Sequence, residues 1–160
     1  MIDRNAKLPE DDRGATVFSV DPLIVKEHYE ADYYHSYAQD SEFFRALGRG
    51  VLLGSECKRC RVRYATPRAH CMRCGGRTEW FQLPPRGRVH TFTTCYFGSE
   101  EFLNETPYNL VMVEFDGVDT LFLGRLVGAS TEDIYVGMPV RARFRRLQRF
   151  RVTDVYFVPE

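Results

Sequence analysis

The second half of the chain alternates apolar and polar residues, which is the two-residue period of β-strands. Val140, Ala142 and Phe144 are expected to face a core, and the arginines between them to face solvent. The stretch 130–138 opens with hydroxyl and acidic residues, a pattern typical of the start of a short helical turn. Five alternating stretches occur, at residues 87–97, 108–115, 119–127, 140–147 and 150–158. Five short strands with a helical element before the fourth predict a closed or nearly closed barrel of the OB type.

The N-terminal part of the chain shows a helical period instead. Asp21-Pro22 has the residue types of a helix N-cap and first turn. Large side chains then recur every four positions, at Val25, Tyr29, Tyr33 and Tyr37. A second short helix, EFFRAL, is predicted after Asp40-Ser41 and should end at Gly48. The tyrosine face of the first helix either packs on the rest of this protein or docks on a partner, since tyrosine suits both roles.

The composition indicates a folded protein without a membrane span. With 160 residues, 44% of them hydrophobic, the chain is long enough for one ordinary domain or two very small ones. It has no apolar run of about 18 residues, and its polar start lacks the apolar segment of a secretory signal. The expected compartment is therefore the cytoplasm, where paired cysteines favour a metal over disulfides.

The charges cancel overall but are unevenly distributed. The first 50 residues carry ten acidic and six basic side chains, and the remaining 110 carry 12 acidic and 16 basic ones. Only Lys7, Lys26 and Lys58 are lysines, so the basic chemistry is that of arginine, whose planar fork suits phosphate and carboxylate. This excess falls well short of the basic stripe of a dedicated nucleic-acid binder.

Four cysteines form two CxxC pairs separated by ten residues. They are Cys57, Cys60, Cys71 and Cys74. Two such knuckles facing each other give a tetrahedral site for Zn²⁺, with Zn–S bonds of about 2.3 Å. Because four thiolates leave no open coordination position, the predicted metal is structural rather than catalytic. Iron in a rubredoxin-like site is an alternative, since tetrahedral sulfur ligation suits it as well.

No familiar catalytic motif occurs in the sequence: it contains no Walker A, GxGxxG, GxSxG or HExxH pattern. The fifth cysteine, Cys95, lies in a predicted strand, with His90 five residues earlier as a candidate base. On a regular strand, residues an odd number apart point to opposite faces, which argues against this pair. Cys95 is therefore interpreted as a small buried apolar residue.

Several segments in a fixed order make the chain similar to one known family. They are LLGSECKRC, YATPRAHCMRCG, TEWFQL, GRVHTFTT, PYNLVMVEFDG, LGRLVG and EDIYVGMPVRARF. Over residues 43–158 the chain resembles the family catalogued as domain of unknown function 35, whose members join a rubredoxin-like zinc ribbon to an OB-fold. One departure is Arg61, which stands where the first knuckle of the family usually has glycine. The metal site is expected to survive this change with a less ideal turn.

The resemblance implies an accessory subunit rather than a free-standing enzyme. Members of the family associate with thiolase-fold enzymes, including ketoacyl-CoA thiolases and related acyltransferases, and with MaoC-type hydratases. It therefore implies a non-catalytic, zinc-binding subunit of a thiolase-like acyl-CoA C-acyltransferase complex, which binds or positions acyl-CoA or CoA and stabilises its partner. The N-terminal segment resembles the helical arm with which family members embrace a partner. The acyl group, the direction of the reaction and the stoichiometry stay open.

Three parts are predicted: a helical arm at 1–49, a zinc ribbon at 50–83 and an OB-fold at 84–160. CoA offers phosphates to arginine and an adenine to an aromatic ring, and candidate contacts lie where the ribbon meets the barrel. These candidates are Arg59, Arg61, Arg63, Tyr64, Arg68, Arg86, Arg88 and Phe97.

Two other functions remain as alternatives. The first is a module that binds single-stranded nucleic acid, because zinc ribbons and OB barrels both occur in such proteins. Its phosphate track would be Arg141, Arg143, Arg145, Arg146, Arg149 and Arg151. The zero net charge and the acidic N-terminal third count against it. The second is an independent enzyme that uses Cys95 as an acyl acceptor.

Overall fold

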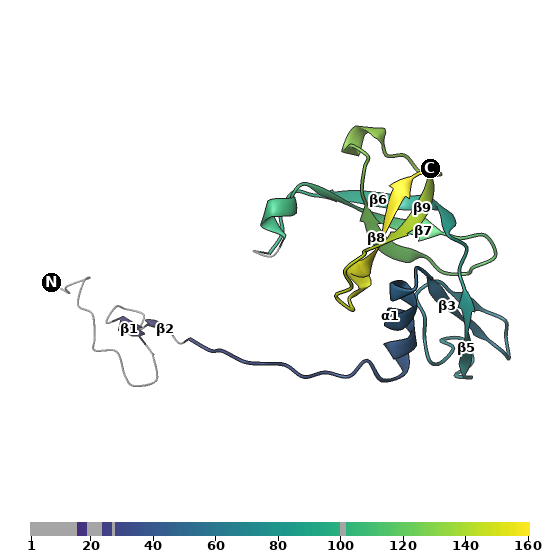
Figure 1. Ribbon diagram of the computed structural model, residues 1–160, viewed down its shortest axis with the longest axis horizontal. Coiled ribbons are helices and arrows are strands. Elements are labelled where there is room, and N and C mark those ends of the chain that lie inside the picture. Colours follow the sequence, from purple (N-terminus) through teal and green to yellow (C-terminus); the bar gives the residue numbers. More distant parts are fainter. Residues whose placement is uncertain (1–15, 19–23, 27, 100–101) are drawn as a thin grey trace. The chain divides into compact units, whose positions relative to one another are not determined.

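The computed structural model divides the chain into two compact units, Met1–His35 and Ser36–Glu160 (Figure 1). It describes residues 16–18, 24–26, 28–99 and 102–160. In the first unit, the strands β1 (Thr16–Phe18) and β2 (Ile24–Lys26) pair antiparallel. The second unit holds the cysteines and the predicted barrel.

The first predicted helix is wrong within the described residues. Asp21-Pro22, its expected start, lies outside them, Val25 lies in β2, and residues 28–37 contain neither helix nor strand. Three tyrosines of this segment are almost fully exposed: Tyr29, Tyr33 and Tyr34. A four-residue recurrence stabilises a helix mainly when a core covers the recurring face. Of the recurring tyrosines, Tyr37 packs against the core of the second unit, whereas Tyr29 and Tyr33 are exposed.

The second predicted helix is confirmed as α1 (Ser41–Gly48), which follows the 3-10 turn η1 (Ala38–Asp40). Asp40 occupies the N-cap position, but its side chain makes no capping hydrogen bond. The buried residues of α1 are Phe43, Phe44, Ala46 and Leu47. They lie on one face at helical spacing, and the Phe43 ring lies 6.4 Å from that of Phe122 in the barrel. The helix is therefore held by tertiary packing on this face.

The two CxxC pairs lie in a ribbon built on a small antiparallel sheet with the strand order β4–β3–β5. Its strands are β3 (Leu53–Cys57), β4 (Arg63–Tyr64) and β5 (Thr78–Gln82). Strand β3 carries the first cysteine of the first pair at its end, and the second pair lies in the connection from β4 to β5. This arrangement gives the predicted ribbon its two knuckles on one sheet.

The five strands that follow close into a barrel in the order β10–β8–β7–β6–β9 (Figure 1). They are β6 (Arg86–Cys95), β7 (Tyr108–Glu114), β8 (Phe122–Leu126), β9 (Pro139–Phe144) and β10 (Val155–Pro159). All neighbours pair antiparallel except β10 and β8, which are parallel. Three 3-10 turns connect the strands: η2 (Leu103–Glu105), η3 (Thr131–Asp133) and η4 (Val152–Asp154). The predicted helical element before the fourth barrel strand is η3.

One apolar cluster joins the barrel to α1 and to the ribbon sheet. Leu52, Ala65 and Leu83 from the ribbon belong to the same cluster as the barrel residues Val89 and Val111. Completely burying a side chain of this size contributes about 1.5–3 kcal/mol, so this shared cluster holds the ribbon against the barrel. In β9, Val140 and Ala142 are buried and Phe144 packs partly buried against the cluster, as the alternation predicts.

The fold class is confirmed: the described residues are mainly β, with one short α-helix among them before a cysteine-bearing ribbon and a five-stranded OB barrel. Within the described ranges, the structure has no helix of the length and apolar character that a membrane crossing requires.

Candidate functional site

The first knuckle begins where β3 ends. The backbone N–H of Arg61 donates to the carbonyl of Cys57 at 2.9 Å, and the N–H of Cys57 donates to the carbonyl of Val62 at 2.9 Å. These two bonds close a tight turn around Cys60. The turn therefore presents the sulfur atoms of Cys57 and Cys60 on the same side.

The second knuckle repeats this pattern. The N–H of Gly75 donates to the carbonyl of Cys71 at 2.9 Å, and the N–H of Cys71 donates to the carbonyl of Gly76 at 2.8 Å. The N–H of Arg73 also points at the sulfur of Cys71, at 3.4 Å. Such amide donors stabilise thiolates, which are the form of cysteine that binds a metal.

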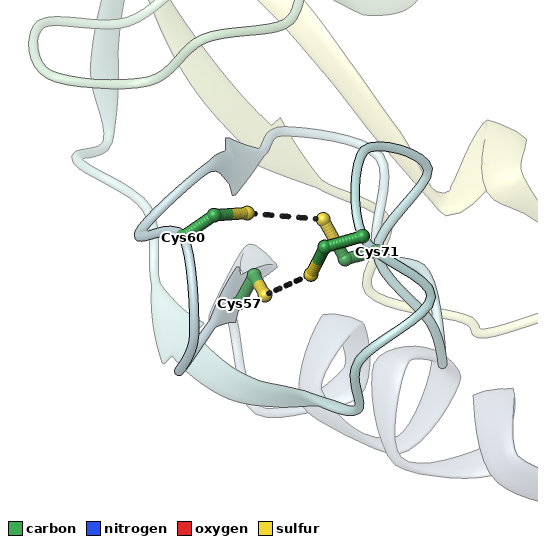
Figure 2. Close-up of side chains that lie close together, drawn as sticks. Cys57, Cys60 and Cys71 are labelled. Carbon is green, nitrogen blue, oxygen red and sulfur yellow. Dashed lines mark hydrogen bonds between the residues drawn. The ribbon is translucent and has the colours of Figure 1, made fainter.

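The four sulfur atoms converge between the two knuckles, and Figure 2 shows Cys57, Cys60 and Cys71 turned toward one another. All four lie within 4.8 Å of one another. The sulfur of Cys57 lies 3.5 Å from that of Cys74, and the sulfur of Cys60 lies 3.3 Å from that of Cys71. A tetrahedron with Zn–S bonds of about 2.3 Å places its sulfurs about 3.8 Å apart. The cluster can therefore hold a metal ion, and the donor set fits the tetrathiolate site predicted from the spacing.

Tyr64 lies directly behind this cluster. Its side chain is buried, its hydroxyl lies 3.2 Å from the sulfur of Cys71, and the same oxygen accepts the N–H of Met72 at 3.0 Å. Before a metal binds, the hydrogen bond from Tyr64 lowers the pKa of Cys71 to about 6. The neighbouring Cys71 in turn raises the pKa of Cys60 to about 12. The first proton therefore leaves the cluster easily at neutral pH, while a metal must displace the last ones.

The residue after each knuckle has a left-handed backbone. Arg61 has φ +62° and Gly75 has φ +70°, so the two positions are structurally equivalent. Glycine adopts this region without steric cost, whereas another residue gives up about 1–2 kcal/mol. The unusual arginine of the first knuckle thus keeps the turn but strains it.

Two of the candidate CoA contacts on the ribbon are engaged with an acidic group. Arg61 and Arg63 both pair with Glu56, at 2.8 Å and 2.9 Å, beside a hollow of about 440 Å³ that also involves Asp119. Arg59 is exposed on the first knuckle. A phosphate at this hollow would compete with the carboxylate of Glu56.

The candidates on the barrel lie at a different place. Arg86 pairs with Glu160 at 2.5 Å, and Arg88 lies 3.6 Å from Asp116. Both arginines line a hollow of about 240 Å³, which contains none of the ribbon residues. The structure therefore does not gather the predicted arginines into one cluster.

The two aromatic candidates differ in exposure. Tyr64 is buried against the cysteines, so it has no face to offer an adenine, and its stacking role in the prediction does not fit. Phe97 is 90% exposed beyond the end of β6 and keeps that possibility open.

Arg68 lies in a third place, a pocket of about 250 Å³ that sequence reasoning missed. This pocket is lined by Arg68, His70, Arg77 and Trp80 together with Asp40 and Glu79. Most of its lining residues come from β5 and from the segment between the knuckles. These two stretches are separated in the sequence but adjacent in the ribbon. In the sequence, the residue that indicates this pocket is Trp80, the single tryptophan of the chain. In the structure it lies on a strand and is 39% exposed.

His90 and Cys95 both lie in β6 and have different partners on the neighbouring strand β7. The Nδ1 atom of His90 lies 3.0 Å from a carboxylate oxygen of Glu114, while Cys95 pairs across the sheet with Tyr108. Burial, followed by the hydrogen bond with Cys95, raises the pKa of Tyr108. No contact between His90 and Cys95 supports a nucleophile and its base at this position.

Comparisons with known proteins agree with this architecture. Residues 80–145 match the family model described as the ChsH2 C-terminal OB-fold domain. The chain is 31% identical over 102 residues to a DUF35 domain-containing scaffold protein of Methanocaldococcus jannaschii. This match covers 62% of this chain and 72% of the relative. A scaffold protein of the same description from Methanothermobacter thermautotrophicus is 25% identical over 99 residues, covering 61% of this chain and 74% of the relative.

Two solved structures share the fold. The one described as "Ltp2-ChsH2(DUF35) aldolase" has a TM-score of 0.63 and 21% identity, and the match covers 81% of this chain and 98% of that chain. A DUF35-family protein of unknown function from Sulfolobus solfataricus has a TM-score of 0.59 and 18% identity, over 80% of this chain and 90% of that one. At these identities the likeness establishes the ribbon-and-barrel fold alone.

Proposed function

The chain belongs to the DUF35 family, and from that premise we propose that it is a non-catalytic accessory subunit of an enzyme complex. The proposed complex is thiolase-like, and the subunit holds a structural zinc ion and positions acyl-CoA for a partner that carries out the chemistry. The scaffold description of two relatives supports the accessory role. The aldolase complex described for one structural neighbour names another enzyme class with which such a fold is associated.

The observation that carries the proposal is the closed set of four sulfur atoms within 4.8 Å of one another. A zinc ion held by four thiolates has no position left for water or substrate, so it acts on the fold rather than on a substrate. Among the described residues, these cysteines are the one group of three or more metal-binding side chains. The metal would fix the two knuckles and, through them, the connection from β4 to β5.

For the CoA nucleotide, the pocket around Arg68 is the best supported position of the three. Arg68 and Arg77 offer cationic donors to a phosphate, His70 offers a ring N–H, and Trp80 offers an exposed aromatic face to an adenine. The acids there include Glu79, which pairs with Lys58. At the other two hollows, by contrast, each candidate arginine that lines them already has a carboxylate partner.

Two measurements test the accessory role. Metal analysis of the purified protein should give one zinc or iron per chain. Co-expression should then yield a complex with a thiolase-like enzyme whose turnover of acyl-CoA depends on this subunit. Full turnover by the partner alone would refute the role.

Binding of CoA is tested separately through Trp80, whose fluorescence should change on titration with CoA. Dephospho-CoA, which lacks the 3′-phosphate, should bind about tenfold more weakly, and Arg77→Glu should remove the difference between the two ligands. Arg88→Glu, at the barrel hollow, is the matched control and should leave the titration unchanged. Equal binding of both ligands to the native protein would refute a phosphate site in this pocket.

A further inference from the structure

A groove of about 580 Å³ on the barrel is lined by a mixture of apolar and basic side chains and is separate from the cysteine cluster. We call it the barrel groove. Its apolar lining comes from Val127, Phe144, Leu147 and Tyr156, and its basic lining from Arg125, Arg145 and Arg146. No acidic side chain is among the described residues that line it.

The loop between β9 and β10 forms one wall of the barrel groove and presents apolar side chains to solvent. Leu147 is 86% exposed, and Phe150 in the same loop is 49% exposed. A turn between two strands ordinarily carries small polar residues, because an exposed large apolar side chain gains nothing from folding. Exposed apolar residues bordered by charged ones are typical of protein interaction sites.

This loop is held in one shape by hydrogen bonds. The carboxylate of Asp154, which is 2% exposed, accepts the backbone N–H of Arg149 at 2.9 Å and that of Arg151 at 3.3 Å. The hydroxyl of Tyr37 donates to the carbonyl of Phe150 at 2.7 Å. The loop therefore displays Leu147 and Phe150 in a fixed arrangement, which reduces the entropy lost on binding.

The rim of the barrel groove already stabilises one carboxylate. Glu105 pairs with Arg125, and this hydrogen bond lowers the pKa of Glu105, with further contributions from Arg145 and Arg149. In the described part of the chain, the guanidinium groups of Arg146 and Arg149 make no ion pair. They remain available to a second carboxylate brought by another molecule.

We propose that the barrel groove is the docking site for an acidic amphipathic helix of a partner protein. The apolar side chains of that helix would pack on Val127, Leu147 and Tyr156, and its carboxylates would pair with the arginines of the rim. This inference rests on the proposed function in one respect, since it takes the chain to be a subunit of a complex.

The shape and chemistry of the groove favour a protein over the other anionic partners. An anionic membrane is flat, whereas much of the apolar lining is concave and belongs to the strands β9 and β10 rather than to a protruding tip. A single-stranded nucleic acid needs exposed rings for base stacking, but three of the four apolar lining residues are Val127, Leu147 and the half-buried Phe144. Both alternatives are outcomes of the test.

The test uses the full, zinc-loaded chain and a labelled synthetic peptide of about 18 residues, with leucines at the i, i+3, i+4, i+7 spacing and glutamates beside them. A second peptide of the same composition has its leucines distributed around the helix. Fluorescence anisotropy should show that the patterned peptide binds at least about tenfold more tightly than the second one. Leu147→Ser and Arg146→Glu should each weaken its binding about tenfold, and Arg77→Glu on the ribbon should not change it.

Equal affinity for the two peptides, or unchanged affinity in both groove variants, would overturn the proposal. Stronger binding to phosphatidylserine-containing vesicles or to oligothymidine, lost in the same variants, would also overturn it and assign the groove to a membrane or to nucleic acid. The metal content and the dependence of the enzyme partner on this subunit are measured on the same preparations. If they persist while the groove variants have no effect, the docking proposal fails and the accessory role stands.

Discussion

Exchange of Arg61 for glycine and for alanine isolates the backbone strain in the first knuckle. Both variants lose the ion pair with Glu56, which involves an arginine side chain that is 73% exposed and contributes about 0–1 kcal/mol. Only glycine adopts the left-handed backbone of this position without the cost of about 1–2 kcal/mol that arginine and alanine have. The greater conformational freedom of glycine in the unfolded chain offsets about 0.4–1 kcal/mol of this stabilisation. Arg61→Gly should therefore be more stable than Arg61→Ala by about 1 kcal/mol.

Gly75 supplies the matched control at the equivalent position of the second knuckle. Its φ is +70°, and a Cβ atom added there would meet no other atom within 4 Å. Gly75→Ala therefore changes the energetic cost of the left-handed backbone and introduces no steric clash. It should lower the free energy of unfolding by about 1 kcal/mol.

The assay is urea unfolding at a fixed free zinc concentration, because a metal that binds only the folded protein adds to the apparent stability. In a thermal scan the same difference corresponds to a shift in Tm of about 2–4 °C for a chain of this size. Equal stability of Arg61→Gly and Arg61→Ala, with Gly75→Ala destabilised, would refute the left-handed conformation of Arg61. The metal would then hold the first knuckle in another turn.

Three further predictions concern the metal and the charged groups. Removal of the metal with a chelator should change the fluorescence of Trp80 in β5 and abolish cooperative unfolding of the ribbon, since a structural zinc contributes on the order of 10 kcal/mol to folding. Unchanged fluorescence and unfolding would contradict a structural role. Tyr64→Phe should weaken zinc binding about tenfold in competition with a chelator, because the sulfur of Cys71 loses its hydroxyl donor; unaltered affinity would exclude that contribution. The hydrogen bond with Arg125 lowers the pKa of Glu105 in the folded protein below its ordinary value of 4.5. The ionised carboxylate therefore stabilises the folded state fully at pH values above 4.5, and this stabilisation is lost as the pH falls through the lower folded-state pKa. Glu105→Gln should reduce stability at pH 7 and flatten its acid dependence, and a parallel pH profile in both proteins would contradict the pairing.

The barrel was predictable because its signal is local and repeated. Each strand carries its own alternation, as with Val140, Ala142 and Phe144, and each faces one core. The segment after Asp21-Pro22 has an equally regular period, but the structure has neither helix nor strand in residues 28–37. A period of four positions indicates a helix only if something covers the recurring face, and a single sequence does not tell which faces are covered.

Some residues of the candidate site were likewise predictable from the sequence, and others were not. The four cysteines that could hold a metal follow from spacing, because a CxxC pair specifies its own turn. The charged surfaces do not follow from spacing: Arg61 and Arg63 pair with Glu56 of the adjacent strand β3. Arg88 lies beside Asp116, in the turn after β7. The pocket beside Trp80 arises from residues on both sides of the second knuckle, and the barrel groove from residues spread over positions 125–156. Such juxtapositions depend on register and closure, which no local pattern encodes.

The ribbon and the barrel belong to one compact unit, Ser36–Glu160, and two kinds of contact join them. The backbone N–H of Arg63 in β4 donates to a carboxylate oxygen of Asp119 at 2.7 Å, and that of Ala65 donates to the hydroxyl of Thr120 at 2.9 Å. The apolar cluster adds Leu52 and Leu83 to the barrel core. A metal that orders the knuckles therefore also orders the strand that is bonded to the loop between β7 and β8. In the accessory subunit proposed above, such coupling would allow the proposed ligand pocket on the ribbon and the proposed docking surface on the barrel to cooperate.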